Sequence, residues 1–497
     1  MQKYVSIHLD RTNSKPLYQQ LFEQLLDLIK QQKIINNEKL PPIRKLANLL
    51  DVNTVTVVNA YRLLEQNNLV YSRVGSGTFV RIPANDVSNA QDTEEKDLHE
   101  YDVPELKMMD QGQVEISEDA INFASVIPAP ELFPVDDFKI ILNEILDRDK
   151  GNAFGYQESQ GFLPLRESIS SYLEQNGIIT RPDNIQIISG AQQGIDIIAK
   201  TLVNFGDYII TESPTYTGAI AAFKSRGARI IPITIKDDGI SIEKLEKAIK
   251  TFHPKLIYTM PNFQNPTGYC YSDEKKKALL ELSAKENLYI IEDDSFTELS
   301  YDNIERHPLK AIDDNQRVIY IKSFSKIFMP GLRVAFLVSP ENVIPDLVAA
   351  KHSSDVSTSG FIQRAFYLYL KKNLWKKHIL HMKNVYRERY LVMLESMRRN
   401  FPDDVTFDAP GGGMTFWAKL PNACSADEFY KQCLESNVII TPGSLFYPDN
   451  HDTNYFRLSF AALYPQDIEK GIVELSKCYQ RHAASPRLKK AEYTPLL

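Results

Sequence analysis

Cysteine is scarce in this sequence, which contains four cysteines among 497 residues. They lie far apart and form no Cys-x-x-Cys pair, so the sequence lacks the spacing of the disulfide framework found in small secreted domains. We therefore expect reduced thiols and no metal site. The four residues are Cys270, Cys424, Cys433 and Cys478.

Long apolar runs are also missing. No stretch of about 18 consecutive apolar residues is present, so no membrane-spanning helix is predicted. Residues 1–10 lack the apolar core of a secretory signal peptide. Both absences favour a globular protein of the cytoplasm. A chain of 497 residues, 43% of them hydrophobic, is long enough for two or three domains with full cores.

Charge is distributed unevenly along the chain, whose net charge is -7. Residues 1–81 contain 11 Lys and Arg against 6 Asp and Glu, whereas residues 82–120 contain 2 against 12. The basic segment has the charge expected of a domain that binds a phosphate backbone. The acidic segment has too little apolar surface to fold. We predict a basic domain over 1–82, a flexible acidic linker over 83–120 and a large domain after it.

The basic segment has the pattern of a small helical domain followed by a β-hairpin. Apolar residues recur at helical spacing over 17–29, and a short second helix is predicted at 43–50. After a turn, a third helix runs to about residue 66, with Thr54 as its predicted cap. Two short alternating strands, 69–71 and 77–80, surround glycines and predict a hairpin. This order of elements predicts a winged helix-turn-helix.

Three motifs of this segment resemble the GntR-family winged helix-turn-helix: PLYQQ at 16–20, LPPIRKLA at 40–47 and GSGTFV at 75–80. The resemblance covers about residues 14–82 and implies a DNA-binding domain. The DNA contacts that it implies come from Arg44, Asn53, Thr54, Thr56, Gly75 and Gly77. The family usually has serine where this chain has Pro42, and often a basic residue where it has Thr54. The operator sequence therefore cannot be transferred from the family to this chain. A surface ion pair is the alternative role of Arg44.

From about Ile121 onward, short apolar segments alternate with helical patterns. Strands are predicted at 185–189, 208–211, 256–260, 289–292, 318–322 and 334–338. This alternation predicts βα units around a mostly parallel sheet. Binding sites in such sheets gather beyond the carboxyl ends of the strands, and polar motifs follow these segments here.

The run SFSKIFMPGLR at 323–333 follows one of these strands and contains two hydroxyls, one lysine and one arginine. A partly desolvated lysine is nucleophilic and forms an imine with an aldehyde. Hydroxyls and a guanidinium neutralise a bound phosphate. These are the groups that a pocket for pyridoxal 5'-phosphate needs.

Four other motifs follow strands, and each is weak evidence by itself. A helix opens at 190–194, and its free N–H groups can bind phosphate. Tyr216 offers a ring face for stacking, although a tyrosine more often only packs. Asn265 lies in an Asn-Pro turn and could donate to a phenolate oxygen. Asp293 could keep a pyridine nitrogen protonated. Their order along the chain with Lys326 favours one coenzyme site.

Together these residues resemble the fold-type I pyridoxal-phosphate enzymes of the aspartate aminotransferase superfamily, over about residues 121–485. The resemblance implies the α/β pyridoxal-phosphate-dependent transferase fold. The large subdomain would span about 151–340, and the small subdomain about 341–485 together with 121–150. Residues 486–497 would form a tail.

The resemblance also assigns roles to residues. It implies that Lys326 holds the coenzyme as an imine and that Asp293 holds the pyridine nitrogen. The other implied coenzyme contacts are Ala191, Gln192, Tyr216, Asn265, Ser323, Ser325 and Arg333. Tyr156 would reach the phosphate from the second subunit of a homodimer. Arg457, in YFRLSF at 455–460, would pair with the carboxylate of an amino compound.

One position departs from that pattern. Many relatives have a tyrosine shortly after the aspartate, where this chain has Phe296, which cannot donate a hydrogen bond to the ring oxygen of the coenzyme. The departure argues mildly against a fast transaminase and for a domain that binds the coenzyme more than it turns over.

A GntR-type domain fused to an aminotransferase-like domain resembles the MocR/GabR family of bacterial transcriptional regulators. The resemblance implies a dimer in the cytoplasm, located at the nucleoid when it binds double-stranded operator DNA. We predict that aldimine exchange at Lys326 with an amino compound changes DNA binding. A sensor of pyridoxal phosphate itself and a working aminotransferase with an autoregulatory DNA-binding domain are the alternatives.

Overall fold

The computed structural model divides the chain into two compact units, Met1–Tyr101 and Asp102–Leu497. It describes residues 2–4, 7, 9–10, 15–30, 33–34, 38–66, 69–73, 77–80, 119–302 and 304–484. The predicted linker lies outside the described residues except for its last two, and the predicted tail, 486–497, lies entirely outside them. Within the described ranges no helix is long and apolar enough to cross a membrane.

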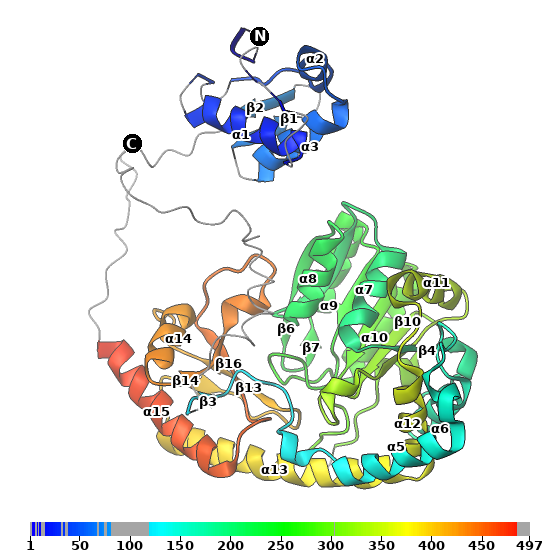
Figure 1. The fold of residues 1–497 in the computed structure, drawn as a ribbon. Helices are drawn as coiled ribbons and strands as arrows, with labels where there is room; N and C mark the ends of the chain where they lie inside the picture. The colour runs from blue at the N-terminus through cyan, green and yellow to red at the C-terminus, as the bar shows by residue number, and fades with distance from the viewer. Residues whose placement is uncertain are drawn as a thin grey trace. The chain divides into compact units, whose positions relative to one another are not determined.

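The N-terminal unit has the predicted order of elements (Figure 1). They are α1 Leu17–Lys30, α2 Ile43–Leu49, α3 Thr54–Gln66, β1 Val70–Arg73 and β2 Gly77–Val80. The strands pair antiparallel, with Val70 opposite Val80. α3 packs on α1 and α2 because its apolar face, with Val57 and Leu64, is completely buried. The predicted winged helix-turn-helix is therefore confirmed.

An eight-stranded sheet lies at the centre of the C-terminal unit (Figure 1). Its order is β4 Ile185–Ile188, β11 Ala335–Val338, β10 Val318–Ser323, β9 Tyr289–Asp294, β8 Leu256–Thr259, β5 Tyr208–Ser213, β6 Arg229–Lys236 and β7 Gly239–Ile240. The strands from β10 to β6 run parallel, whereas β11 is antiparallel to both of its neighbours and β7 is antiparallel to β6. The six predicted strands are present, whereas β6 and β7 were not predicted.

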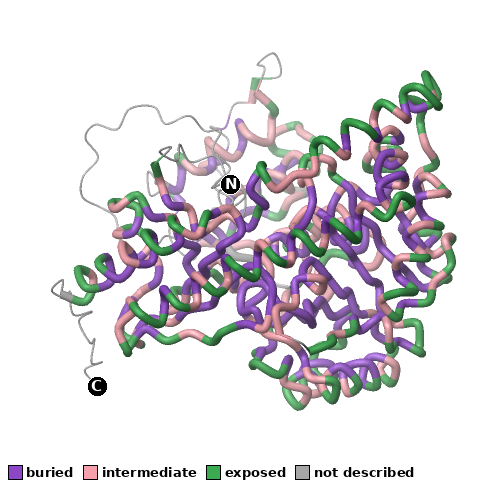
Figure 2. The backbone as a smooth tube through the Cα atoms, turned by 90° about the horizontal axis from the view of Figure 1, so that it is seen from below, coloured by how far each residue is buried: buried purple, intermediate pink, exposed green. Residues whose placement is uncertain are grey.

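Helices cover both faces of this sheet, which explains why its central strands are almost entirely buried and why most of them begin with apolar residues. One face packs against α7 Ala191–Leu202, α8 Thr217–Ser225 and α11 Ile344–Asp355. The other packs against α6 Leu163–Glu174, α9 Ile242–Phe252, α10 Asp273–Lys285 and α12 Gly360–Lys371. Figure 2 shows buried residues concentrated in the interior and exposed residues along the periphery. α5 Val135–Asp149 packs on α12.

A second, four-stranded sheet consists of β12 Thr406–Phe407, β13 Thr415–Lys419, β16 Tyr455–Ser459 and β15 Thr441–Pro442. The helices of this part are α13 Leu374–Asn400, α14 Ala426–Glu435 and α15 Pro465–Ala484, and α15 packs on both α13 and α14. β3 Ile121–Asn122 pairs with β14 Val438–Ile439, so the chain around residue 121 joins this C-terminal part. The subdomain boundaries stay predictions, and the packing of α11 on α7 favours a boundary later than residue 340.

Candidate functional site

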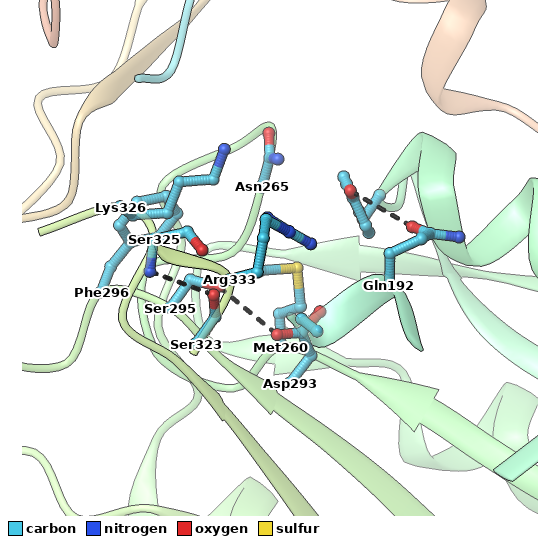
Figure 3. A pocket seen from close by; sticks show the side chains of 12 residues that line it. Gln192, Met260, Asn265, Asp293, Ser295, Phe296, Ser323, Ser325, Lys326 and Arg333 are labelled. Carbon is cyan, nitrogen blue, oxygen red and sulfur yellow. Dashed lines mark hydrogen bonds between the residues drawn. The ribbon is translucent and has the colours of Figure 1, made fainter. Parts of the chain in front are cut away.

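A cavity of about 110 Å³ lies beyond the carboxyl ends of β8, β9 and β10 (Figure 3). Its lining comes from the strand ends, the loops that follow them and the start of α7. The lining residues are Ala191, Gln192, Tyr216, Met260, Asn265, Asp293, Ser295, Phe296, Ser323, Ser325, Lys326 and Arg333. Every predicted coenzyme contact except Tyr156 is among them, while the role of each stays a prediction.

Lys326 lines this cavity from the loop after β10. Burial lowers the pKa of its amine to about 8, the charges of Arg457 and Arg333 act in the same direction, and Asp293 opposes them. A fraction of the amine is therefore neutral and nucleophilic near neutral pH. The nearby Lys322 differs, since it pairs with Glu298 at 2.6 Å and with Asp294 at 3.2 Å. These pairs keep Lys322 charged and leave Lys326 as the reactive candidate.

Three consecutive carboxylates occupy the end of β9, and only Asp293 lines the cavity. Alternation along the strand turns Glu292 and Asp294 to the opposite face. Asp293 accepts hydrogen bonds from the Tyr258 hydroxyl at 2.8 Å and from the Ser295 hydroxyl at 3.4 Å. Burial raises the pKa of Asp293 to about 6. A cationic N–H group in the cavity would therefore find an oriented carboxylate as its partner.

The first turn of α7 forms one wall of the cavity. Gly190 precedes the helix with φ +115°, and an added Cβ would lie 2.2 Å from Nη2 of Arg333. That guanidinium donates to the carbonyl oxygen of Ser189, and Figure 3 shows it directed toward Gln192. The hydroxyls of Ser323 and Ser325 face the same space. Helix N–H groups, hydroxyls and a guanidinium together make a site for a phosphate dianion.

Arg457 lies on β16 of the smaller sheet and is only 8% exposed. Its Nη1 donates to Oδ1 of Asn265 at 2.9 Å, and its Nη2 donates to the Ala124 carbonyl at 2.8 Å and to the Thr441 hydroxyl at 3.1 Å. Within the described residues these acceptors are neutral, and Nε has no partner. Burial lowers the pKa of Arg457 to about 10. A buried guanidinium with neutral partners is suited to bind a carboxylate.

Some residues of the site were not predicted from the sequence. Tyr258 and Met260 stand at the end of an apolar strand, where nothing distinguishes them from core residues. Ser295 and Thr441 carry only a hydroxyl, which no local sequence pattern marks as functional. Tyr156, in contrast, was predicted but is 91% exposed and does not line the cavity of this single chain. Its contact with the phosphate of a second subunit stays a prediction.

The predicted DNA contacts are placed in part. Asn53, Thr54 and Thr56 lie at the start of α3. Arg44 lies on α2 with its side chain outside the described residues, Gly75 is outside them too, and Gly77 begins β2. Thr54 as the helix cap is wrong, because Thr54 is already helical. Oδ1 of Asn53 accepts from the Val55 backbone N–H at 3.0 Å, so Asn53 is the cap.

The cavity fits pyridoxal phosphate group by group. The phosphate site at α7 matches a dianion, Lys326 matches an aldehyde, and Asp293 matches a protonated pyridine nitrogen. The position of Gly190, where a Cβ would displace Arg333, indicates that space at this wall is reserved for the guanidinium and its ligand. The donor set would therefore hold this coenzyme.

Two family models match the chain. The model described as aminotransferase class I and II matches residues 132–475, and that of the gntR family of bacterial regulatory proteins matches residues 17–80. The first match covers most of the described C-terminal unit, and the second covers the helices and strands α1 to β2 of the N-terminal unit.

Several relatives match nearly the whole chain, among them two bacterial proteins. The uncharacterized HTH-type transcriptional regulator YdfD of Bacillus subtilis is 30% identical over 91% of this chain and 95% of its own. The probable rhizopine catabolism regulatory protein MocR of Rhizobium meliloti is 26% identical over 95% of each chain. Among solved structures, LysN, the alpha-aminoadipate aminotransferase of Thermus thermophilus complexed with N-(5'-phosphopyridoxyl)-L-leucine, is 32% identical. Its TM-score is 0.70, and the match covers 76% of this chain and 97% of that chain.

Proposed function

The chain belongs to the aminotransferase class I and II family and carries a gntR-type helix-turn-helix domain, as MocR-type regulators do, and we propose that it is a DNA-binding transcriptional regulator that senses a small amino compound. One observation carries this proposal. The same chain contains a winged helix-turn-helix and a cavity that brings Lys326 to Asp293 and Arg333. Relatives that match over the whole length are described as regulators, which supports the same function.

The cofactor of this fold is pyridoxal phosphate. When bound, it supplies an electrophilic carbon for amines and an electron-withdrawing ring. Asp293 would hold a proton at the ring nitrogen, and Arg333 would hold the phosphate. Lys326 is the amine with which an incoming amino compound competes, and Arg457 would bind the carboxylate of that compound. Phe296 offers no hydroxyl, which favours binding over rapid turnover.

A homodimer is part of the proposal. Tyr156 is 91% exposed and Phe154 is 67% exposed in the single chain, and large aromatic side chains so exposed are typical of an interface. A second subunit that covers them would bring Tyr156 to the partner cavity. Two DNA-binding domains would then be held at a spacing that effector binding changes. Sedimentation of the full-length protein as a monomer, with and without coenzyme, would contradict this part of the proposal.

The test compares wild type with Lys326→Ala and with Lys250→Ala, which removes an exposed lysine outside the cavity. The probe DNA is the fragment upstream of the protein's own gene, and amino acids and amines are titrated against the complex. We expect an absorbance band near roughly 420 nm, and amine-dependent DNA affinity, in the wild type and in Lys250→Ala. Lys326→Ala should lose both.

Two results would contradict the proposal. DNA affinity that no amine and no coenzyme changes would exclude sensing through this cavity. Turnover of an amino acid with a 2-oxo acid above about 1 per second, with DNA binding indifferent to amines, would instead identify a working aminotransferase. The 32% identity to LysN over the C-terminal unit is the observation that keeps this second function in the test.

A further inference from the structure

Helix α3 separates its buried and exposed residues onto two opposite faces. Val57, Ala60 and Leu64 are completely buried in the N-terminal unit. At 3.6 residues per turn, successive residues are about 100° apart, so the positions opposite this core face are Val55, Asn59 and Arg62. Val55 is 58% exposed although it lies in the first turn of the helix. An apolar side chain therefore points directly away from the core, at the end of the helix that enters a major groove in helix-turn-helix proteins.

The neighbouring polar side chains are engaged within the helix start. Oδ1 of Asn53 accepts from the Val55 N–H at 3.0 Å and from the Thr54 hydroxyl at 3.3 Å. Thr54 and Thr56 lie about 85° and 75° from the mean direction of the core face, so they flank the outward face rather than occupy it. The cap fixes the first turn and thereby the direction in which Val55 points.

The composition of this helix limits what it can read. No lysine or arginine occurs among residues 54–61, so the first two turns lack the side chains that bind guanine with two hydrogen bonds. The apolar group that the major groove exposes on its floor is the C5-methyl of thymine. Valine cannot bind a phosphate or a base edge by hydrogen bonding, and a thymine methyl is the partner that covers its apolar surface.

From this geometry we propose that Val55 contacts a thymine methyl group, and that each half-site of the operator has a thymine at this position. Asn59 follows one turn later on the same face, where an amide would read adenine. Arg62 comes after it at the outer end of the face, where a cation binds the backbone phosphate. The inference rests on the proposed function, because it requires that α3 binds duplex DNA.

The experiment first selects binding duplexes from a random 30-base-pair library with the full-length protein. Each thymine of the selected duplex is then replaced, one at a time, by deoxyuridine, which lacks only the C5-methyl group. We expect one thymine in each half-site at which uracil weakens binding about fourfold, the effect of one buried methyl group. The other thymines should tolerate the replacement.

Val55→Ala supplies the second arm. The variant should bind the selected duplex about fourfold more weakly than the wild type and should no longer distinguish thymine from uracil at that position. Val58→Ala is the matched control, since Val58 lies on the flank of the same helix and should keep the discrimination. Both side chains are at least partly exposed, so neither change removes core packing.

The outcomes separate the inference from the function on which it rests. If the library yields no enriched duplex, the protein is not a sequence-specific DNA binder and both fall. If a duplex is enriched but uracil is tolerated at every position, or if Val55→Ala keeps the discrimination, only the role of Val55 is overturned. A Val55→Ala variant that changes the amine response while its DNA binding is unaltered would show that the face packs against protein, which also overturns it.

Discussion

Arg457 and Asn265 form a hydrogen bond of 2.9 Å between Nη1 and Oδ1, although 192 residues separate them in the sequence. Arg457 belongs to the smaller sheet, and Asn265 lies in the loop after β8 of the larger sheet. The bond therefore connects the two sheets beside the cavity. A ligand carboxylate would be a stronger, charge-assisted acceptor than the neutral amide. Binding of an amino acid would exchange this connection for one that passes through the ligand.

Arg457→Lys should weaken binding of amino acids by about 10-fold to 100-fold, because an ammonium cannot form the paired hydrogen bonds of a guanidinium. Amines of the same skeleton without a carboxylate should bind equally well to the variant and the wild type. Absorbance titration of the coenzyme-loaded protein measures both affinities. Arg399→Lys changes an exposed arginine of α13 and serves as the control. Equal losses for amino acids and simple amines would show that Arg457 does not bind the carboxylate.

Gly190→Ala should strongly reduce affinity for the coenzyme. The new Cβ would lie 2.2 Å from Arg333, and φ +115° is unfavourable for alanine, so both the guanidinium and the helix start must move. We expect a loss of at least about tenfold, measured by equilibrium dialysis of pyridoxal phosphate. Gly331→Ala is the matched control, because nothing lies within 4 Å of a Cβ at that position. Comparable affinities in the two variants would contradict the assignment of this wall to the phosphate.

The sequence predicted most of the sheet and the gathering of the site residues. Residues 318–321 of β10 form a continuous apolar run because helices cover both faces of the sheet, and such runs stand out between helical patterns. Residues that follow parallel strands meet at one edge of a sheet, so the sequence alone predicts that Asn265, Asp293 and Lys326 lie together, and all three line the cavity.

Other features depend on contacts that no local pattern contains. β6 alternates in burial and includes a proline, which weakens the strand signal. Tyr258 looks like a core residue until its hydroxyl is found at Asp293. The carbonyl of Ala124 reaches Arg457 over 333 residues, and only the pairing of β3 with β14 places it there. Whether Asn53 or Thr54 caps α3 depends on the exact residue at which the helix begins. Sequence patterns do not resolve a helix boundary to one residue.

Asn53→Ala should destabilise the start of α3 by about 1 kcal/mol, because the Val55 N–H loses its side-chain acceptor. Thr54→Ala should cost less, since the Thr54 hydroxyl only donates to Asn53 at 3.3 Å. Hydrogen exchange of the α3 amides in the full-length protein measures the difference, with protection expected to fall about fivefold in Asn53→Ala. A larger effect of Thr54→Ala would restore Thr54 as the cap.

Asp293→Asn should stabilise the protein without coenzyme, and the gain should grow with pH. Burial raises the pKa of Asp293 to about 6 from its usual 3.8. Between these values the folded state keeps a proton that the unfolded state releases, so stability falls as pH rises and the full cost is present above pH 6. The gain of the variant should therefore be about 2 kcal/mol larger at pH 7.5 than at pH 4.5.

Added coenzyme should favour the stability of the wild type over that of Asp293→Asn. Asparagine is neutral and cannot keep the pyridine nitrogen protonated, so the variant should gain less stability from added pyridoxal phosphate than the wild type does. Denaturant unfolding at the two pH values, with and without coenzyme, measures all four differences, and Asp403→Asn provides an exposed control. A gain that is independent of pH would mean that the Asp293 carboxylate carries no charge-burial cost. The residue would then owe its place in the cavity to packing rather than to charge.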